Sequence, residues 1–421
     1  MDRPFSNLSD LAQALAQAMN LISTEVQNHH QKVAYLAWNI AGEMNLSERE
    51  RLMVLGGALM HDVGSVTMQG QLSLRDLEKD AMTLARAGAS ILKSHPLTRD
   101  FTDVVKNSQT PWRRLRALSL LRPVLLGQVV HLADRVSLMM DETRPVLNQV
   151  ARIRACIAET GEREYHPEVL AAFERVSRRE AVWLDMLYMP GRFLDYLPDS
   201  RRVSLDETLQ YTELVSHLID FRSPFTAMHS AGVAATAEAL SGLAGMSESE
   251  CSMMRIAGHL HDIGKLKIPR EILEKPGKLT DEEFNIMKEH AYFSYEILRQ
   301  IRGFEQIAAW AAFHHEKLNG EGYPFHLTAR EIPLGARIMA VADVFSAITE
   351  DRPYRRGMDR EQALAVLRGD VARGGLSRDV VELLIQNYGA INAARDTAAH
   401  IAGRRYYEAM EKSDGDALQT D

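Results

Sequence analysis

Apolar residues recur three or four positions apart along most of the chain, which is the period of a helix with one buried face. The pattern is clearest in six segments, at residues 8–21, 48–60, 205–218, 231–243, 282–297 and 362–367. Ser247-x-x-Glu250 and Thr280-x-x-Glu283 have the spacing of capping boxes, which mark the start of a helix. Strand-type alternation is almost absent. The sequence therefore predicts an all-α protein.

Polar residues set into these apolar segments form a repeat along the chain. The motif His-Asp-x-Gly occurs at residues 61–64 and again at residues 261–264, so its two copies are 200 positions apart. Other polar residues recur at offsets of about 200, namely His29 with His229, His95 with His290, and Asp134 with Asp343. We interpret the repeat as two copies of one fold, and so expect two helical bundles in tandem.

The length of 421 residues is consistent with two domains. Residues 189–204 contain Pro190-Gly191, Pro198 and a charged run, which is typical of a linker. We therefore expect a first domain over residues 1–200 and a second over residues 205–411. The polar composition of residues 412–421 predicts a disordered tail.

Composition and charge narrow the function. Hydrophobic residues make up 46% and charged residues 25% of the chain, as in ordinary globular proteins. No apolar run is long enough to span a bilayer, no signal peptide is recognisable, and Cys156 and Cys251 form no metal-type pair, so we expect a cytoplasmic protein. The net charge of −8 argues against a partner such as DNA or RNA. A small phosphorylated substrate remains compatible if metals or a few basic side chains meet its charge.

The second copy contains a set of side chains suited to metal binding. Five histidines and two aspartates lie next to apolar stretches, where unpaired titratable groups are costly: His229, His261, Asp262, His290, His314, His315 and Asp343. Imidazole and carboxylate groups suit Fe, Mn, Zn or Ni, and this set could hold two such ions. Asp262 is the natural bridging ligand because a carboxylate has two oxygens. Two neighbouring metals are suited to hydrolysis of a phosphodiester.

Several motifs in this half resemble the HD-GYP family of cyclic di-GMP phosphodiesterases. They are His261-Asp262-Ile263-Gly264-Lys265, His314-His315-Glu316 and Gly320-x-Gly322-Tyr323-Pro324, and the resemblance covers roughly residues 205–400. It implies an α-helical HD bundle in which one metal is held by His229, His261, Asp262 and Asp343. The other metal would be held by Asp262, His290, His314 and His315. Iron or manganese is expected first, with nickel or zinc as alternatives.

The resemblance also implies contacts to substrate. Lys265 would touch the scissile phosphate, and Arg352 and Arg355 would face phosphate or guanine. Residues 322–324, which are Gly322, Tyr323 and Pro324, would form a substrate-facing loop. From the residues alone, Lys265 also fits a helix C-cap, residues 320–324 a plain turn, and the two arginines surface charges.

Two departures from the family pattern bear on the chemistry. Some members have a glutamate four residues before the first histidine and hold a third metal, but Phe225 stands there, so we expect two metals. Many members have an aspartate three residues after the last ligand, where this chain has Ser346. If that aspartate transfers protons, its absence would alter the rate or the substrate preference.

The first copy keeps only part of the set, namely His29, His61, Asp62, His95 and Asp134. Ser65 replaces the lysine, and residues 104–112 contain no histidine pair. Four of the retained groups could hold one metal, as in simpler HD hydrolases. We favour a degenerate copy with a structural or regulatory role over a second active site.

The leading hypothesis is an enzyme that hydrolyses cyclic di-GMP to the linear dinucleotide pGpG, to GMP, or to both. A 3′,3′-cyclic GMP-AMP phosphodiesterase is the close alternative. Two others remain open: a general HD phosphohydrolase for nucleotides, and a non-catalytic cyclic-dinucleotide receptor. A homodimer would fit a helical module of this kind.

Overall fold

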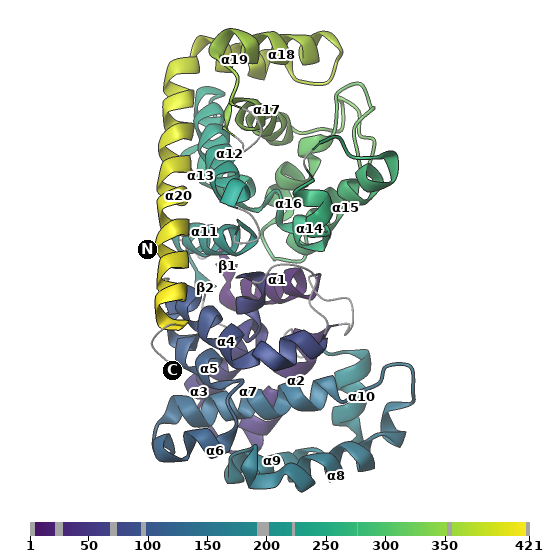
Figure 1. Cartoon of the computed structure of the whole chain (residues 1–421). Coiled ribbons are helices and arrows are strands. Elements are labelled where there is room, and N and C mark those ends of the chain that lie inside the picture. Colours follow the sequence, from purple (N-terminus) through teal and green to yellow (C-terminus); the bar gives the residue numbers. More distant parts are fainter. Residues whose placement is uncertain are drawn as a thin grey trace. The chain divides into compact units, whose positions relative to one another are not determined.

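The computed structural model describes residues 5–21, 28–67, 74–93, 98–191, 202–220, 224–275, 277–351 and 356–417. The chain divides into two compact units, one of residues 11–201 and one of residues 202–421 together with the first ten residues. Helices dominate both units, and the described residues contain a single two-stranded sheet (Figure 1). The predicted all-α class is confirmed.

The first unit is built around α7, which spans Arg122–Leu138. Val129, Val130, Leu132 and Val136 are fully buried, and so are the polar residues Gln128, His131 and Asp134, so this helix is buried on nearly every side, as expected of a central helix. The other helices of this unit are α1 (Leu8–Asn20), α2 (His29–Glu43), α3 (Glu48–Met60), η1 (Val63–Thr67), α4 (Leu74–Lys93), η2 (Arg99–Phe101), α5 (Thr102–Asn107), α6 (Trp112–Leu115), η3 (Arg116–Leu118), η4 (Val146–Asn148), α8 (Val150–Thr160), η5 (Gly161–Arg163), α9 (Pro167–Val176) and α10 (Glu180–Tyr188).

The second unit has α17, Leu334–Thr349, in the same central role. Ile338, Met339, Val341 and Phe345 are fully buried, and each buried side chain of this size contributes about 1.5–3 kcal/mol of transfer free energy. Its other elements are β2 (Arg202–Val203), α11 (Leu205–Asp220), α12 (Pro224–Leu243), α13 (Glu248–Leu260), η7 (Ile263–Lys267), α14 (Arg270–Leu273), α15 (Asp281–Leu298), α16 (Glu305–Ala312), η8 (Phe313–His315), α18 (Arg360–Ala372), α19 (Arg378–Gln386) and α20 (Tyr388–Ala417).

Capping boxes begin corresponding helices in the two units. Ser47 caps α3 and Ser247 caps α13, and each side chain accepts from the backbone N–H of a glutamate three residues later. Thr280 caps α15 in the same way. The boxes predicted at Ser247 and Thr280 are confirmed. Both α3 and α13 then run for 13 residues and end at a His-Asp pair, so equal local signals place the two pairs alike.

The first described residues of the chain pack with the second unit, whereas the predicted boundary places them in the first domain. Ser6–Asn7 form β1, which pairs antiparallel with Arg202–Val203. The rings of Phe5 and Phe304 lie 5.8 Å apart. A two-residue ladder is too short to produce an alternating pattern, so no pattern in the sequence predicts this pairing.

The helix α20 continues to Ala417, and so includes residues 412–417 of the segment for which a disordered tail is predicted. Residues 412–417 extend a helix that is already nucleated, which needs little further free energy. Residues 418–421 lie outside the described residues. Residues 192–201, which are most of the linker expected at residues 189–204, also lie outside them. Within the described part of the chain, no helix is both long enough and apolar enough to cross a membrane.

Candidate metal centre

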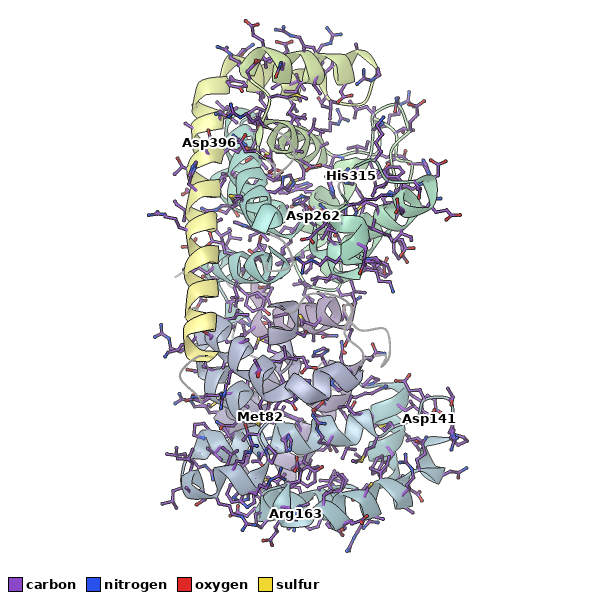
Figure 2. All side chains as sticks on the ribbon, in the orientation of Figure 1. Met82, Asp141, Arg163, Asp262, His315 and Asp396 are labelled. Atoms are coloured by element: carbon purple, nitrogen blue, oxygen red, sulfur yellow. The ribbon has the colours of Figure 1, made fainter. Side chains whose placement is uncertain are left out.

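The His261-Asp262 pair lies at the turn that follows α13 (Figure 2). His261 Nδ1 donates a hydrogen bond to the backbone oxygen three residues earlier, at 2.8 Å. His290 on α15 and His314 in η8 make the same bond, at 2.6 Å each. A carbonyl can only accept, so Nδ1 carries the ring proton in all three imidazoles. In the neutral ring, each Nε2 therefore presents a lone pair to the site, as a metal ligand must.

Gly264 holds this turn directly against α15. A side-chain Cβ at this position would lie 2.0 Å from the backbone oxygen of His290, so only glycine permits the approach. The amide of Gly264 donates to Ser294 Oγ at 3.0 Å, and Ser294 Oγ donates to the backbone oxygen of His261 at 2.8 Å. These contacts fix the distance between two segments that carry predicted ligands.

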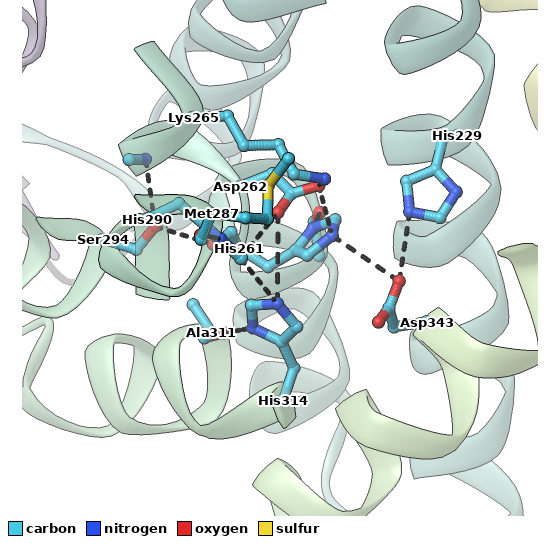
Figure 3. A network of polar contacts seen from close by, with 12 residues as sticks. His229, His261, Asp262, Lys265, Met287, His290, Ser294, Ala311, His314 and Asp343 are labelled. Carbon is cyan, nitrogen blue, oxygen red and sulfur yellow. Dashed lines mark hydrogen bonds and ion pairs between the residues drawn. The ribbon is translucent and has the colours of Figure 1, made fainter. Parts of the chain in front are cut away.

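Six of the seven predicted ligands form two groups on either side of the seventh, Asp262, and Figure 3 labels all of these residues except His315. One group is His229, His261 and Asp343, and the other is His290, His314 and His315, with the ligand atoms of each group within 4.8 Å of one another. A third group, His261, Asp262 and His314, shares members with both.

The two carboxylate oxygens of Asp262 face different groups of ligands. Its Oδ2 lies 3.0 Å from His261 Nε2, and its Oδ1 lies 3.5 Å from His290 Nε2 and 4.0 Å from His314 Nε2. On the far side of the first group, His229 Nε2 lies 3.1 Å from Asp343 Oδ1. Asp262 thus lies between the two groups of candidate ligands, with one oxygen facing each group.

Charge around Asp262 favours the ionised carboxylate. Burial alone would raise the pKa of Asp262, but the neighbouring His261 and Lys265 hold it well below its usual range. Lys265 reaches the same carboxylate through its Nζ, which ion-pairs with Oδ2. An acceptor that stays ionised is what a divalent cation requires.

The second group consists of neutral imidazoles. Burial lowers the pKa of His290 to about 4 and that of His314 to about 3, and it also lowers the pKa of His315 well below the ordinary value. These histidines therefore take up no second proton near neutral pH, and protons do not compete with a metal for their free ring nitrogens.

His229 is held differently, because both of its nitrogens face carboxylates. Nδ1 lies 3.0 Å from Glu350 Oε2, while Nε2 faces Asp343. Burial would lower the pKa of His229, yet Glu350 and Asp343 raise it to about 10. Without a metal, this ring holds a proton between two acids, and a bound cation would replace that proton. Glu350 was not predicted from the sequence, because it lies 121 residues from His229 and belongs to none of the recognised motifs.

Two buried polar atoms in the centre, His261 Nε2 and Asp262 Oδ1, make no hydrogen bond of acceptable geometry, although His261 Nε2 lies 3.0 Å from Asp262 Oδ2. Leaving such atoms unsatisfied costs about 1–3 kcal/mol each, and more for a charged group. Both belong to predicted ligands and both face the interior of the cluster. A metal ion bound at this position would satisfy both, so the donor set fits a metal centre.

The loop predicted to face substrate lies beside the second group. The ring of Tyr323 is centred 4.8 Å from that of His315, and the Tyr323–Pro324 peptide is cis. A Cβ on Gly322 would lie 2.3 Å from the backbone nitrogen of Lys317, so the loop folds tightly on itself.

Buried Glu316 anchors this loop. Its carboxylate accepts from the backbone amides of Phe325 at 2.7 Å and Leu327 at 2.9 Å. Arg352 and Arg355 lie outside the described residues, as does the side chain of Phe225. Ser346, at the position of the missing aspartate, is buried and its Oγ has no hydrogen-bond partner.

The first unit holds a smaller cluster. His29 Nε2 lies 3.1 Å from Asp134 Oδ1 and 3.3 Å from His61 Nε2, and His61 Nε2 lies 3.2 Å from Asp62 Oδ2. Four of the five retained groups therefore meet, whereas His95 lies outside the described residues. Among the described residues of this unit, His29, His61 and Asp62 form the single group of three with metal-site spacing.

Asp134 in this cluster also has protein partners. Its Oδ2 accepts from Gln109 Nε2 at 2.9 Å and lies 3.4 Å from Arg135 Nη2. Burial would raise the pKa of Asp134, but Arg135 and His29 hold it well below its ordinary value. Arg135 therefore places a positive charge beside Asp134. The corresponding aspartate of the second unit, Asp343, has uncharged neighbours in sequence, Ala342 and Val344.

Two family models, both described as HD domain, match the chain at residues 26–139 and 213–374. A 3′3′-cGAMP-specific phosphodiesterase of Vibrio cholerae is 28% identical over 396 residues, which is 90% of this chain and 92% of that protein. A second enzyme of that description from Vibrio cholerae is 27% identical, over 86% of this chain and 90% of the relative.

Other relatives match the chain in part. A cyclic di-GMP phosphodiesterase of Thermotoga maritima is 40% identical over 160 residues, which is 38% of this chain and 44% of that protein. Among solved structures, a cyclic GMP-AMP-specific phosphodiesterase of Vibrio cholerae matches with a TM-score of 0.65 and 19% identity, and it covers 91% of this chain and 98% of that one. At that identity the structural match supports the fold.

Proposed function

The chain belongs to the HD-domain hydrolases of HD-GYP type, with two HD domains in tandem, and from that premise we propose that its second domain hydrolyses a 3′,5′-linked cyclic dinucleotide. The observation that carries the proposal is the position of Asp262, whose Oδ2 faces His261 and whose Oδ1 faces His290 and His314, between two groups of three candidate ligands. Cyclic di-GMP is the first substrate proposed, and the product is pGpG, GMP or both.

The residues divide into two ligand sets around Asp262. His229, His261, Asp262 and Asp343 would hold one ion. Asp262, His290, His314 and His315 would hold the other, and iron or manganese suits both sets, with nickel and zinc as alternatives. Two bound metals would supply Lewis acidity and lower the pKa of a water molecule that attacks phosphorus.

The protein's own groups position the substrate and its charge. Lys265 would meet the scissile phosphate, because its ammonium already lies at the Asp262 carboxylate. Tyr323, with Gly322 and Pro324, would form the wall of the site beside His315. Arg352 and Arg355 are proposed to contact phosphate or guanine. With Ser346 in place of an acid, proton transfer to the leaving oxygen would fall to a solvent molecule or to another group.

A second candidate substrate is 3′,3′-cyclic GMP-AMP. The relatives described as 3′3′-cGAMP-specific include two that align with both halves of this chain, whereas the cyclic di-GMP phosphodiesterase of Thermotoga maritima aligns with 38% of it. Tandem organisation is therefore associated with this substrate among those relatives.

The first domain is proposed to be structural or regulatory. Its cluster has no second group equivalent to His290, His314 and His315 among the described residues, and Arg135 and Gln109 occupy Asp134 Oδ2. One metal at His29, His61, Asp62 and Asp134 is compatible with that role.

The test is product identification. Purified full-length protein is incubated with cyclic di-GMP and with 3′,3′-cyclic GMP-AMP, each with Mn(II) and with Fe(II), and products are separated by chromatography. We expect linear dinucleotides or mononucleotides from at least one substrate. Binding of a cyclic dinucleotide without any turnover by metal-loaded protein would instead support a receptor.

A further inference from the structure

Two exposed aromatic side chains lie on α15, the helix that carries His290. Phe284 is 44% exposed and Tyr292 is 45% exposed. The exposed large apolar side chains in the described part of the chain include one other aromatic residue, Tyr188, which belongs to the first unit. Single exposed apolar residues are common, but aromatic rings beside a nucleotide site are candidates for contacts with a base.

Phe284 ends a series of rings that begins at the metal centre. The ring centroids of His315 and Tyr323 are 4.8 Å apart, and those of Tyr323 and Phe284 are 5.9 Å apart and nearly perpendicular. Both distances are short, so a single residue, Tyr323, lies between the exposed ring of Phe284 and His315 of the second ligand group. A nucleotide whose phosphate lies at Asp262 extends away from that phosphate toward its base.

Charge at this position also suits a nucleotide. Lys288 lies one turn after Phe284 on α15, and its Nζ is 5.3 Å from the centre of the Phe284 ring. Because the ammonium is close to the ring, an anionic ligand that stacks on Phe284 would meet a positive charge rather than a carboxylate.

We propose that Phe284 stacks on a nucleobase of the substrate and so contributes to substrate affinity beside the metal centre. The proposal rests on the proposed function, since it requires a nucleotide substrate. Stacking on an aromatic side chain tolerates either purine, so Phe284 would serve guanine and adenine alike.

Tyr292 provides a matched control on the same helix. Tyr292 is as exposed as Phe284. Its ring packs against that of Phe325, in the loop that also contains Tyr323, and the two ring centroids are 6.3 Å apart. It lies eight residues farther along α15, which corresponds to about 12 Å along the helix axis. Both Phe284→Ala and Tyr292→Ala remove a ring contact with the loop of Tyr323 and Phe325. Only Phe284→Ala would also remove the proposed contact with the base.

The experiment compares Phe284→Ala, Phe284→Leu, Phe284→Trp and Tyr292→Ala in full-length, metal-loaded protein. We expect Phe284→Ala to raise the KM for the cyclic dinucleotide by about 5- to 150-fold, the range for one lost base stack, while kcat changes little. Phe284→Leu should behave like the alanine variant, and Phe284→Trp should restore the wild-type KM. Inhibition by GMP should weaken in Phe284→Ala, and inhibition by inorganic phosphate should not.

The outcomes separate the two proposals. If wild-type protein is active and Phe284→Ala has the wild-type KM, or if Tyr292→Ala raises KM as much, the base contact is wrong and the phosphodiesterase remains. If phosphate and GMP inhibition weaken together, Phe284 acts on the metal centre and the stacking role is again wrong. If wild-type protein hydrolyses no cyclic dinucleotide, the proposed function fails first, and the base contact with it.

Discussion

Replacing Gly264 with alanine tests whether the contact between the His261-Asp262 turn and α15 sets the geometry of the metal centre. The added Cβ would lie 2.0 Å from the backbone oxygen of His290 and 2.9 Å from the amide nitrogen of Ser294. Both neighbours are backbone atoms, which cannot rotate away. Since Cβ contacts below 3.0 Å are essentially never seen, the turn and α15 must separate by about 1 Å.

That separation acts on both stability and activity. Overpacking of this kind costs about 1–3 kcal/mol, and weakening the hydrogen bond from Gly264 to Ser294 adds about 1 kcal/mol. It also moves His261 and Asp262 away from His290, and a 1 Å misplacement of reacting groups can lower the rate about 100-fold. We therefore expect kcat/KM to fall by about two orders of magnitude, with fewer than two metals bound in the second unit.

The assay measures metal per chain, kcat/KM for a cyclic dinucleotide and the thermal midpoint. Gly242→Ala on α12 is the matched control, because its added Cβ would have Cys251 Sγ as its nearest neighbour, at 3.9 Å. Alanine favours a helix over glycine by about 1 kcal/mol, so this variant should be at least as stable as the wild type. Wild-type metal content and rate in Gly264→Ala would refute the reasoning.

Three further predictions follow from individual contacts. Glu350→Gln removes the negative partner of His229 Nδ1 and should weaken metal binding at that group about 10- to 100-fold in a titration; unchanged affinity would remove Glu350 from the site. Gly64→Ala, whose Cβ would lie 2.0 Å from the backbone oxygen of Leu84, should lower the thermal midpoint of the first unit, and an unchanged melting curve would contradict that. Burial lowers the pKa of His290 to about 4 in the folded chain against about 6.5 when unfolded, so the unfolded chain binds more protons between these values. Metal-free protein should therefore lose stability as the pH falls from about 6.5 toward about 4, and denaturant midpoints independent of pH in that range would contradict the neutral imidazole.

The fold could be predicted because its signals are local. Helical periodicity and the capping boxes at Ser247 and Thr280 depend on residues three or four positions apart, and the structure keeps both. The pairing of β1 with β2 joins residues nearly 200 positions apart through a ladder of two residues, and nothing in either segment marks it.

The candidate site could be predicted as a set of residues but not as a network. The structure brings His261, His290 and His314 close together, and each lies on a helix or directly at the end of one. The bond from His229 to Glu350 depends on how α12 and the end of α17 meet in three dimensions, which no spacing encodes. The contact of Gln109 with Asp134 in the first unit escaped for the same reason, since Gln109 precedes Asp134 by 25 residues on another segment.

The most direct test of the two-metal phosphodiesterase compares Asp262→Ala with Asp62→Ala, the equivalent change in the first unit, in cyclic-dinucleotide turnover by metal-loaded, full-length protein. Asp262 lies between the two ligand groups, whereas Asp62 belongs to a cluster with one group. We predict that Asp262→Ala reduces turnover to background and that Asp62→Ala retains most of the rate. Full activity in Asp262→Ala, or loss of activity confined to Asp62→Ala, would contradict the account.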